Sequence, residues 1–301
     1  MPVVVTGAAG FIGTALVAEL TCHGIAVVAV DREPMPHLPA GAVPLRADLL
    51  DADPTVPAAL AAADAVFHLA GRAGVRGSGP AAERGRHRDN VLATSVVLDL
   101  VPPRTPLVIT SSSSVYGGSR GWPCTETDPL RPVGGYARSK AAVESLAAGR
   151  LAVGGAVAVA RPFTVVGERQ RPDMALALWA AAARRGDPIR IHGSAARTRD
   201  LTDVRDAARA LRLVAERGLL GPVNVGTGRP HTLAALADAV RAATGVDVPL
   251  QVVPAAAEEP ADTWADPTLL ARRCGLRPYT DLADVVRRAV APAAAPAMVT
   301  A

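Results

Sequence analysis

The first thirteen residues contain the feature that most constrains the fold, a short β-branched run followed by three evenly spaced glycines. Val3–Val5 lead into Gly7, Gly10 and Gly13, and an apolar helical pattern follows. Glycines at these positions let the backbone turn sharply and let the helix pack closely on the strand. The start of a helix has free backbone N–H groups and a partial positive charge, which suits a pyrophosphate. The segment therefore predicts a strand, a tight turn and a helix that bind a dinucleotide.

Short apolar runs alternate with helical patterns through the first half of the chain. The expected strands are Val3–Val5, Ala26–Val30, Val43–Arg46, Ala65–His68, Leu107–Thr110 and Ala156–Ala160. The expected helices are Phe11–His23, Pro57–Ala62, Arg88–Leu100 and Tyr136–Leu151. Such alternation implies right-handed crossovers and a sheet covered on both faces. We therefore expect an α/β fold with a doubly wound parallel sheet.

The second half of the chain is less regular. It contains helical patterns and one short strand pattern, namely Pro172–Arg185, Val204–Glu216, His231–Ala243 and Val223–Val225. We expect residues 1–165 to form a dinucleotide-binding domain, with elements from about 196–232 returning to it. Residues 166–301 are expected to form mainly a smaller mixed α/β substrate-binding domain, with a frayed tail after about residue 290.

Composition argues against several classes of protein. The net charge is +4, and the arginines are scattered without an aromatic-interleaved basic stripe, so we expect no nucleic-acid partner. Cys22, Cys124 and Cys274 form neither a disulfide framework nor a zinc pattern, which favours a reducing compartment. Met1 leads directly into a strand, and no uninterrupted apolar stretch has membrane-spanning length. We therefore expect a cytoplasmic protein without a membrane span. No His/Asp/Cys cluster at ligand spacing is evident in the sequence, so we predict no metal site.

The end of the second expected strand indicates which dinucleotide binds. Asp31 ends this strand, where a carboxylate would accept hydrogen bonds from an adenosine ribose. A carboxylate there repels a 2′-phosphate and favours NAD over NADP, whereas the neighbouring Arg32 acts in the opposite direction. Asp48 and Leu49 follow the third strand and either cap the adenine end of the cofactor or belong to an ordinary loop or helix cap.

Tyr136 and Lys140 form a second informative pair. Their i, i+4 spacing puts the phenol and the ammonium on one face of a helix. A nearby cation lowers the pKa of a phenol from about 10, so that it can act as a general base. Upstream, Ser111–Ser114 follow the fifth strand, at the sheet edge where a hydroxyl can bond a substrate oxygen. Each motif is common by itself, but their combination predicts an active site.

These motifs and several others, in the same order, resemble the extended short-chain dehydrogenase/reductases, and among them the NAD-dependent nucleotide-sugar epimerase/dehydratase family. The other matching segments are His68–Gly71, Asp89–Val91, Ser111–Gly117, Arg161–Gly167, Arg199–Leu201, Asn224–Gly228 and Trp264–Pro267. The resemblance covers nearly the whole chain. It implies a Rossmann domain, NAD as cofactor, a nucleotide-sugar substrate and a homodimer formed through the helices Arg88–Leu100 and Tyr136–Leu151.

The resemblance also implies roles for individual residues. Tyr136 is the expected base, Lys140 is expected to hold the nicotinamide ribose, and Ser112 is expected to assist at the substrate. The expected cofactor-binding residues are Gly7, Gly10, Phe11, Ile12, Gly13, Asp31, Arg32, Asp48, Leu49, Leu69, Ala70, Gly71, Asn90, Tyr136, Lys140 and Phe163. The expected substrate-binding residues are Ser112, Ser113, Thr164, Arg171 and Arg199. An ion pair of Arg199 with Asp200 or Asp203 is the structural alternative for that arginine, and His68 is expected to be structural.

The expected reaction is 4-epimerisation of a nucleotide sugar through transient oxidation of C4 by tightly bound NAD. Sugar 4,6-dehydratases of the family usually have Asp-Glu where this chain has Ser113 and Ser114, and serines cannot supply that acid–base pair. An NAD(P)H-dependent 4-ketoreductase uses the same Ser-Tyr-Lys set and stays open. A non-catalytic NAD(P)-binding regulator on the same fold is a further alternative, although such proteins typically lack the tyrosine or the lysine.

Two positions depart from the pattern of the resembled family. Glu259 stands where many UDP-hexose epimerases have an arginine on the diphosphate, and a glutamate would repel phosphate. Either another arginine replaces it, with Arg197, Arg169 and Arg171 as the candidates, or the substrate is not an ordinary UDP-hexose. Pro162 stands where a larger polar or aromatic residue is frequent. The segment Arg161–Met174 resembles 4-epimerases acting on UDP-hexoses or UDP-hexuronic acids.

Overall fold

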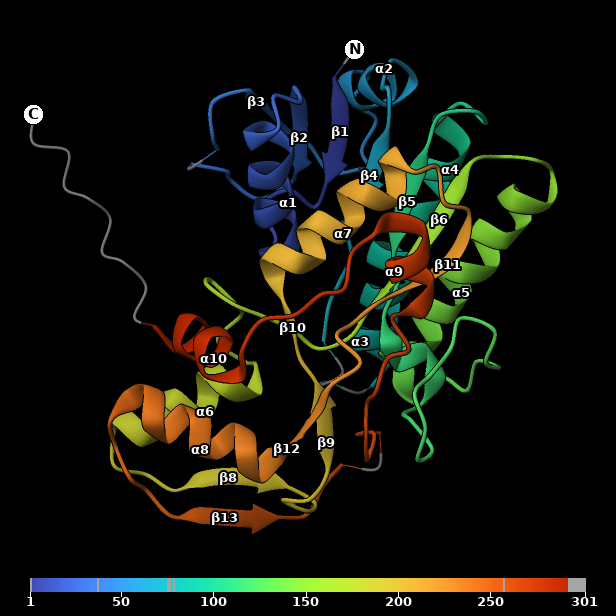
Figure 1. Ribbon diagram of the computed structural model, residues 1–301. Coiled ribbons are helices and arrows are strands. Elements are labelled where there is room, and N and C mark those ends of the chain that lie inside the picture. Colours follow the sequence, from blue (N-terminus) through green and yellow to red (C-terminus); the bar gives the residue numbers. More distant parts are fainter. Residues whose placement is uncertain (1, 37, 75–76, 78, 257, 292–301) are drawn as a thin grey trace, which may run out of the picture.

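The computed structural model describes residues 2–36, 38–74, 77, 79–256 and 258–291. Its main sheet contains β1 (Val3–Thr6), β2 (Val27–Asp31), β3 (Ala42–Arg46), β4 (Val66–His68), β5 (Leu107–Thr110), β6 (Val157–Pro162) and β11 (Gly221–Val225). All neighbouring strands are parallel, in the order β11-β6-β5-β4-β1-β2-β3 (Figure 1). This arrangement confirms the predicted α/β doubly wound sheet.

Helices cover both faces of this sheet, which explains why its inner strands are apolar on both sides. One face packs against α1 (Phe11–Cys22), α7 (Val204–Glu216) and α9 (Thr268–Cys274). The other face packs against α2 (Thr55–Ala61), α4 (Ala93–Leu100) and α5 (Gly134–Ala152). The edge strand β3 is the most open, with Val43 exposed, and it contains Pro44, a residue that sheets tolerate at their edges.

The helix predicted at Arg88–Leu100 is part of a longer helical run. It begins with α3 (Pro80–Arg86), continues as the π-helical segment η1 (His87–Leu92) and ends as α4. Gly79 precedes it with φ +96°, and Pro80 is the first helical residue, a position that suits proline. The wider π-helical turn buries both Asp89 and Asn90, and π-helical turns are frequent at functional sites.

A smaller lobe lies beside the sheet, at the bottom of Figure 1. It contains α6 (Ala175–Arg184), α8 (Leu233–Thr244), α10 (Leu282–Val290) and the parallel pair β8 (Ile189–His192) and β13 (Leu250–Val253). Its core is separate from that of the sheet and is built around Leu176, Trp179, Leu236 and Val286. The small strands and the helices α9 and α10 are not among the elements predicted from the sequence.

Short strand pairs lie between the two lobes. They are β7 (Val165–Val166) with β10 (Thr202–Asp203), and β9 (Thr198–Asp200) with β12 (Pro230–Thr232). After them the chain returns to the main sheet, since β11 pairs with β6 and α9 packs on α7. A short 3-10 helix, η2 (Ser113–Tyr116), follows β5. From residue 292 on, the tail that is predicted to be frayed lies outside the described residues.

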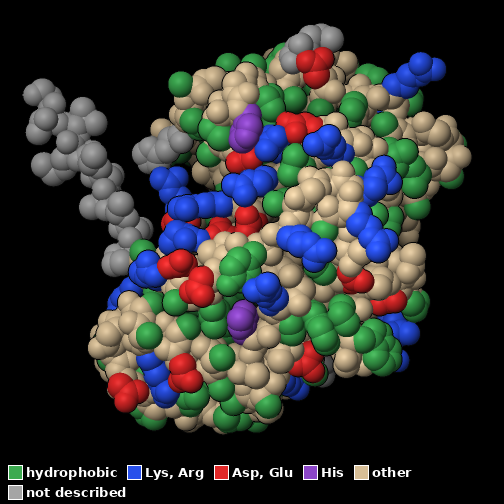
Figure 2. Space-filling view, viewed as in Figure 1, with side chains coloured by type: hydrophobic (Ala, Val, Ile, Leu, Met, Phe, Trp, Pro, Cys, Tyr) green, Lys and Arg blue, Asp and Glu red, His purple; other side chains and the backbone are tan. Residues whose placement is uncertain are grey.

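The described surface carries both signs of charge, and the cysteines are unpaired. Figure 2 shows basic and acidic side chains interleaved along the junction of the two lobes. Cys22, Cys124 and Cys274 are all free thiols. Among the described residues, every helix is too short or too polar to cross a bilayer.

Candidate active site

The glycine turn between β1 and α1 leaves no room for side chains. Gly7 has φ +72°, and a Cβ there would lie 2.5 Å from the backbone nitrogen of Ala70. A Cβ at Gly13 would lie 2.1 Å from the carbonyl oxygen of Gly7. Gly10 caps α1 without a side-chain hydrogen bond. The turn therefore presents bare backbone at a helix N-terminus, which is the surface that a pyrophosphate requires.

A cavity of about 610 Å³ opens beside this turn, at the carboxyl ends of β2 and β3. The predicted cofactor residues in its walls are Gly7, Gly10, Asp31, Arg32, Asp48, Leu49, Leu69, Ala70 and Gly71. The Asp31 carboxylate accepts hydrogen bonds from the backbone of Ala9 (2.9 Å) and Glu33 (3.0 Å). These bonds fix the carboxylate between the glycine turn and the next loop.

Asp48 has features of both alternatives that the sequence leaves open, a loop aspartate and a residue at the adenine end of the cofactor cavity. One of its oxygens accepts a hydrogen bond from the backbone of Leu50 (3.0 Å), as in an ordinary turn. The other lies 2.9 Å from a guanidinium nitrogen of Arg88, and the side chain lines the cavity. These contacts and burial act on the carboxyl in opposite directions, and the net effect lowers the pKa of Asp48.

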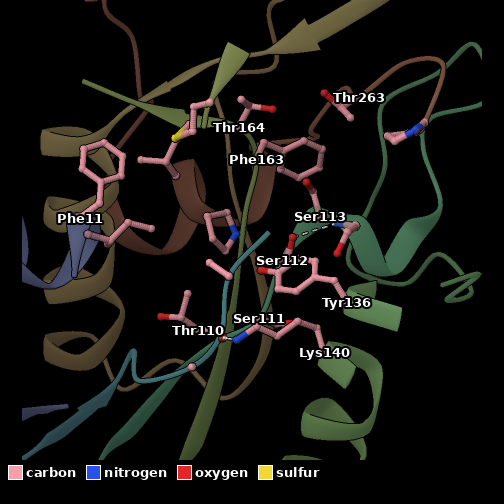
Figure 3. Close-up of a pocket in the computed structure, with 18 of the residues that line it drawn as sticks. Phe11, Thr110, Ser111, Ser112, Ser113, Tyr136, Lys140, Phe163, Thr164 and Thr263 are labelled. Carbon is pink, nitrogen blue, oxygen red and sulfur yellow. Dashed lines mark hydrogen bonds between the residues drawn. The ribbon is translucent and has the colours of Figure 1, made fainter. Parts of the chain in front are cut away.

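A second cavity, of about 550 Å³, continues from the other side of the glycine turn to the carboxyl ends of β5 and β6. Figure 3 shows Ser112 and Tyr136 side by side in it, with Phe163 and Thr164 across from them. The other predicted residues in its walls are Phe11, Ile12, Gly13, Ser113, Lys140, Arg171 and Arg199. Residues from α1, the strand ends, η2, α5 and the smaller lobe are thus brought to one cavity. We call it the sugar-side cavity.

The sequence predicts a lowered pKa for Tyr136, and the structure contradicts this. Burial raises the pKa of the Tyr136 phenol, while a hydrogen bond with Ser112 and the charges of Arg171 and Arg86 act against that rise. Lys140 is not among the groups that lower the pKa. Its ammonium instead donates a hydrogen bond to the carbonyl oxygen of Thr110 (2.8 Å) at the end of β5. Helical spacing puts the two residues on one face of α5, but it does not decide which group the Lys140 ammonium contacts.

Lys140 is the only lysine in a chain whose other basic residues, apart from histidines, are all arginines. Its side chain is 7% exposed. Burial lowers the pKa of its ammonium to about 8, and the charge of Glu144 acts in the opposite direction. An arginine could not lose its proton in this range, so the position has a chemical property that the other cations of the chain lack.

Asn90 and His68 support the site from behind the cavity walls. Asn90 accepts a hydrogen bond from the backbone of Arg72 (2.7 Å) and donates one to the Ser139 hydroxyl (2.8 Å). A Cβ at Gly71 would lie 2.7 Å from the Asn90 oxygen and 3.7 Å from the Lys140 nitrogen, so these three residues meet. His68 is buried between the hydroxyls of Thr6 (2.7 Å) and Thr94 (3.0 Å), as expected of a structural histidine.

A charged network beneath the serines has no role predicted from the sequence. Arg161 forms a buried ion pair with Glu144 (2.6 Å) and donates to the Tyr116 hydroxyl (2.8 Å). Ser111 donates to the same glutamate (2.6 Å). Arg161 and Tyr116 lie in motifs that carry the family resemblance, and those motifs are the only indication in the sequence that these two residues belong to the site. The network ties β6, α5 and η2 together below the sugar-side cavity.

Arg199 pairs with Glu259, and neither of the two predicted partners is involved. A guanidinium nitrogen of Arg199 lies 3.3 Å from the Glu259 carboxylate. Burial lowers the pKa of Arg199, with Glu259 acting against that effect. Asp200 instead accepts hydrogen bonds from the backbone of Gly228 (2.9 Å) and Ala265 (3.0 Å). Asp203 caps α7. The alternative interpretation, an ion pair of Arg199 with Asp200 or Asp203, is therefore wrong, because the Asp200 carboxylate binds loop backbone and the Asp203 carboxylate caps α7 and pairs with Arg288 of α10.

The Arg199–Glu259 pair lies between the sugar-side cavity and a third cavity of about 490 Å³ in the smaller lobe. Thr164 and Met174 also line both cavities. The third cavity is walled by Trp179, Leu201, Leu233 and Leu236, with polar groups at one side, Arg185, Asp187, Arg190 and His192. Of the three arginines considered as replacements at position 259, Arg171 lines the sugar-side cavity. Arg169 lines a groove beside α1 and α7, and Arg197 packs against Gly193.

The sequence shows no evident cluster of metal-ligand residues, whereas the structure contains one. Glu19, Cys22 and His23, on the last turn of α1, bring one ligand atom each within 4.8 Å of one another. The spacing follows a helical turn, which a search for paired motifs misses. The Glu19 carboxylate is already paired with Arg212 (3.0 Å), and Cys22 donates to the backbone of Glu19 (3.1 Å). The Glu19 carboxylate and the Cys22 thiol are therefore already engaged within the protein. The absence of a functional metal site remains a prediction.

The architecture fits NAD on two observations. The bare glycine turn joins two cavities, one with a carboxylate for a ribose and one with Ser112, Tyr136 and Lys140. Two buried hydroxyls in the second cavity, those of Thr110 and Ser114, have no hydrogen-bond partner within the described structure. Burying a polar group without a partner is costly, so these hydroxyls favour a polar ligand there.

Comparisons with known proteins agree with this geometry. Residues 3–226 match the model of the NAD dependent epimerase/dehydratase family. YtcB of Bacillus subtilis, described as an uncharacterized UDP-glucose epimerase, is 29% identical over 97% of both chains. The structure of MoeE5 in complex with UDP-glucuronic acid and NAD is 35% identical, covers 96% of this chain and 97% of that one, and gives a TM-score of 0.86. The UDP-glucuronic acid 4-epimerase of Bacillus cereus, in complex with UDP-glucuronic acid and NAD, is 26% identical with a TM-score of 0.89, covering 96% and 98%. The chain therefore belongs to the NAD-dependent epimerase/dehydratase family.

Proposed function

We propose that this protein is a UDP-hexuronic acid 4-epimerase that holds NAD tightly. The observation that carries the proposal is the shared cavity of Ser112, Tyr136 and Lys140 with the guanidinium of Arg171. The relatives support it, since MoeE5 and the Bacillus cereus 4-epimerase were solved with UDP-glucuronic acid and NAD. The serines at positions 113 and 114 argue against a 4,6-dehydratase, which needs an acid–base pair there.

The side chains of the cavity supply the proton transfer. NAD, when bound, supplies a hydride acceptor and donor at C4 of the sugar. Tyr136 takes the proton of the sugar 4-hydroxyl and later returns it, while Ser112 holds the same oxygen by a hydrogen bond. Lys140 lies in the same cavity and binds the hydroxyls of the nicotinamide ribose. Turning the 4-keto sugar between the two transfers presents its other face, so the configuration at C4 inverts without net oxidation.

Arg171 supports the choice of a hexuronic acid. It lines the sugar-side cavity, and its positive charge acts on the pKa of Tyr136. Its ion pair with Asp173 (2.9 Å) is exposed, so it costs little to rearrange. A guanidinium next to the reacting sugar has only hydroxyl acceptors in a neutral hexose, whereas it can bind the carboxylate of a hexuronic acid through two parallel charge-assisted hydrogen bonds.

The third cavity and the Arg199–Glu259 pair support a nucleoside diphosphate as the carrier. The apolar walls around Trp179 and Leu236 suit a nucleoside, and Arg199, at the entrance to the sugar-side cavity, suits a diphosphate. Glu259 opposes phosphate there, so we propose that Arg199 provides the positive charge that an arginine at position 259 supplies in the resembled epimerases.

The test is proton NMR of UDP-glucuronate, UDP-galacturonate, UDP-glucose and UDP-galactose, each incubated with the enzyme and no added reductant. We expect a second anomeric signal with either uronate, while total sugar nucleotide stays constant. Faster conversion of the neutral hexoses would overturn the assignment of Arg171 but keep the epimerase. No conversion of any sugar would favour the 4-ketoreductase, which then consumes NAD(P)H with a 4-keto sugar.

We also propose that the protein is a homodimer in the cytoplasm. The outer faces of α4 and α5 contain small residues, and Leu92 just before α4 is exposed, which suits close helix packing between two copies. The three free cysteines fit a reducing compartment. Light scattering after size-exclusion chromatography tests the dimer, and a Leu92→Arg variant is expected to shift the mass to that of a monomer.

A further inference from the structure

The sequence places an arginine directly after the carboxylate that selects NAD, and this pair alone leaves the choice of cofactor open. A 2′-phosphate carries up to two negative charges and needs a cation at the end of β2, whereas a 2′-hydroxyl needs only the carboxylate of Asp31. Both Arg32 and Arg88 line the cavity that contains Asp31. Their effect on cofactor choice depends on what these two guanidinium groups already bind.

Two carboxylates, those of Asp89 and Asp48, contact both cations, and Arg32 also pairs with the exposed Glu33 at 3.9 Å. A nitrogen of Arg32 lies 3.3 Å from Asp89 and 3.6 Å from Asp48. Arg88 reaches the same two carboxylates at 2.8 Å and 2.9 Å. The second oxygen of Asp89 accepts a hydrogen bond from Arg72 (3.0 Å). Asp89 thus touches three guanidinium groups and is the centre of the cluster.

Burial distinguishes Asp89 from the cations around it. Its side chain is 6% exposed, whereas Arg32, Arg72 and Arg88 are 44–51% exposed. Burial by itself would raise the pKa of Asp89, but its contacts with Arg88, Arg72 and Arg32 lower it. A buried charge loses its mobility and its screening by water, so its three partners are held close to it. The guanidinium groups of Arg32 and Arg88 are thus already engaged by Asp89 within the cavity that contains Asp31.

The π-helical turn explains how Asp89 reaches this position. In η1, Asp89 and its neighbour Asn90 are both buried. Asn90 binds the backbone of Arg72 and the Ser139 hydroxyl, whereas Asp89 reaches the cavity beside β2. Adjacent side chains of one short segment therefore reach different surroundings, Asp89 the cavity beside β2 and Asn90 the contacts behind the sugar-side cavity.

We infer that Asp89 is a cofactor-specificity residue: by binding Arg32 and Arg88, it withholds from a 2′-phosphate the two cations that could accept it, so that the site selects NAD. Asp31 favours the ribose hydroxyl, and Asp89 removes the competing attraction of Arg32. Asp48, in the loop after β3, also binds Arg32 and Arg88 and so strengthens the selection of NAD. This selection of the cofactor does not depend on which sugar the enzyme converts.

The test measures which nucleotide the protein retains. Wild type and Asp89→Asn are incubated with equimolar NAD and NADP, separated from free nucleotide, denatured and analysed by liquid chromatography. We expect the ratio of retained NADP to NAD to rise by about tenfold in Asp89→Asn, since a charge-assisted hydrogen bond to a phosphate is worth roughly that factor. Asp99→Asn, an exposed aspartate on α4, is the control and should keep the wild-type ratio.

Three further variants make the outcome decisive. Asp89→Glu keeps the charge and should keep the preference for NAD. Adding Arg32→Ala to Asp89→Asn should cancel much of the gain, because it removes one of the two released cations. If Asp89→Asn does not fold, Asp48→Asn releases the same two arginines from one partner each and should raise the ratio less. A folded Asp89→Asn with the wild-type ratio, or in its absence an Asp48→Asn with the wild-type ratio, overturns the inference.

Discussion

The cofactor side and the sugar side of the cavity are built differently. Around the glycine turn, the ligand surface is backbone, and its shape follows from φ angles and from close contacts within the turn and with the backbone that follows the neighbouring strand β4. Around Arg199, the surface is side chain, contributed by strands and loops of the smaller lobe that are up to 60 residues apart. Backbone surfaces tolerate few substitutions, whereas side-chain surfaces can change one residue at a time. Substrate choice can therefore change while the cofactor site stays the same.

The largest expected effect lies where the two sides meet. Tyr136→Phe removes the hydroxyl that we propose moves the proton, and general acid–base catalysis contributes roughly 10²–10⁴-fold. We expect kcat for the uronates to fall by about 10³-fold, with nucleotide retention unchanged. Tyr279→Phe, at an exposed tyrosine, is the matched control. A Tyr136→Phe variant with more than a tenth of wild-type kcat would show that another group moves the proton.

A single glycine substitution on the cofactor side is expected to weaken NAD binding. Gly7 and Gly24 have nearly the same φ, +72° and +74°, but a Cβ at Gly7 would meet neighbouring backbone, whereas one at Gly24 would point into open space. Both alanine variants carry the strain of a positive φ, and only Gly7→Ala also collides with Ala70. We expect about a hundredfold weaker NAD retention in Gly7→Ala. The Gly24→Ala variant should retain NAD normally and lose only about 1 kcal/mol of stability. Equal retention in both would mean that the turn shifts to admit the methyl group.

On the sugar side, a substitution of Arg171 tests which substrate the cavity selects. We expect Arg171→Gln to lower kcat/KM for UDP-glucuronate by about a hundredfold, because a buried carboxylate would lose a bidentate partner. The same variant should change kcat/KM for UDP-glucose by less than about threefold. Arg287→Gln removes an arginine from another exposed ion pair and should change neither value. An equal loss for both substrates would place Arg171 on the diphosphate rather than on the sugar.

A smaller effect is expected at Glu259, the position that departs from the family pattern. Glu259→Gln leaves Arg199 uncompensated and removes a repulsion of phosphate. We expect the Kd of UDP to fall by roughly fivefold, about 1 kcal/mol. The Kd of uridine, which has no phosphate, should not change. Isothermal titration calorimetry of both ligands checks this, and an equal change for uridine would assign the effect to cavity shape rather than charge.

The same contrast between the two sides decides what the sequence could predict. The glycine turn, the strand-end Asp31 and the serines after β5 are local patterns, so their positions in the cavities follow from the order of strands. The partner of Arg199 is not local, since Glu259 approaches it only after the chain has crossed the smaller lobe and returned. Asp89 depends on a π-helical turn, which has no distinct hydrophobic period. The direction of the Lys140 side chain depends on a backbone carbonyl of another strand.

The smallest expected effect is on stability, and it concerns Lys140. The pKa of its ammonium is about 8 in the folded chain, against an ordinary value of 10.5. Between these values the unfolded chain holds more protons than the folded chain, so this group makes stability rise with pH across that window. Below pH 8 the lysine is charged in both states, and burying it costs on the order of 3 kcal/mol.

Lys140→Met removes that cost, although the Thr110 carbonyl then loses its donor, which offsets about 1 kcal/mol. We expect the inactive variant to be more stable than wild type at pH 7, with the difference shrinking from pH 8 to 10.5. Urea unfolding of both proteins at several pH values measures it, and because the chain has no other lysine, the cysteines and tyrosines that titrate there are common to both. A difference that does not change with pH would mean that Lys140 titrates normally. If it does shrink, the lysine of the proposed catalytic set is retained at a cost to stability, whereas Gly7 and Gly13 of the cofactor side are also required by the packing of the turn.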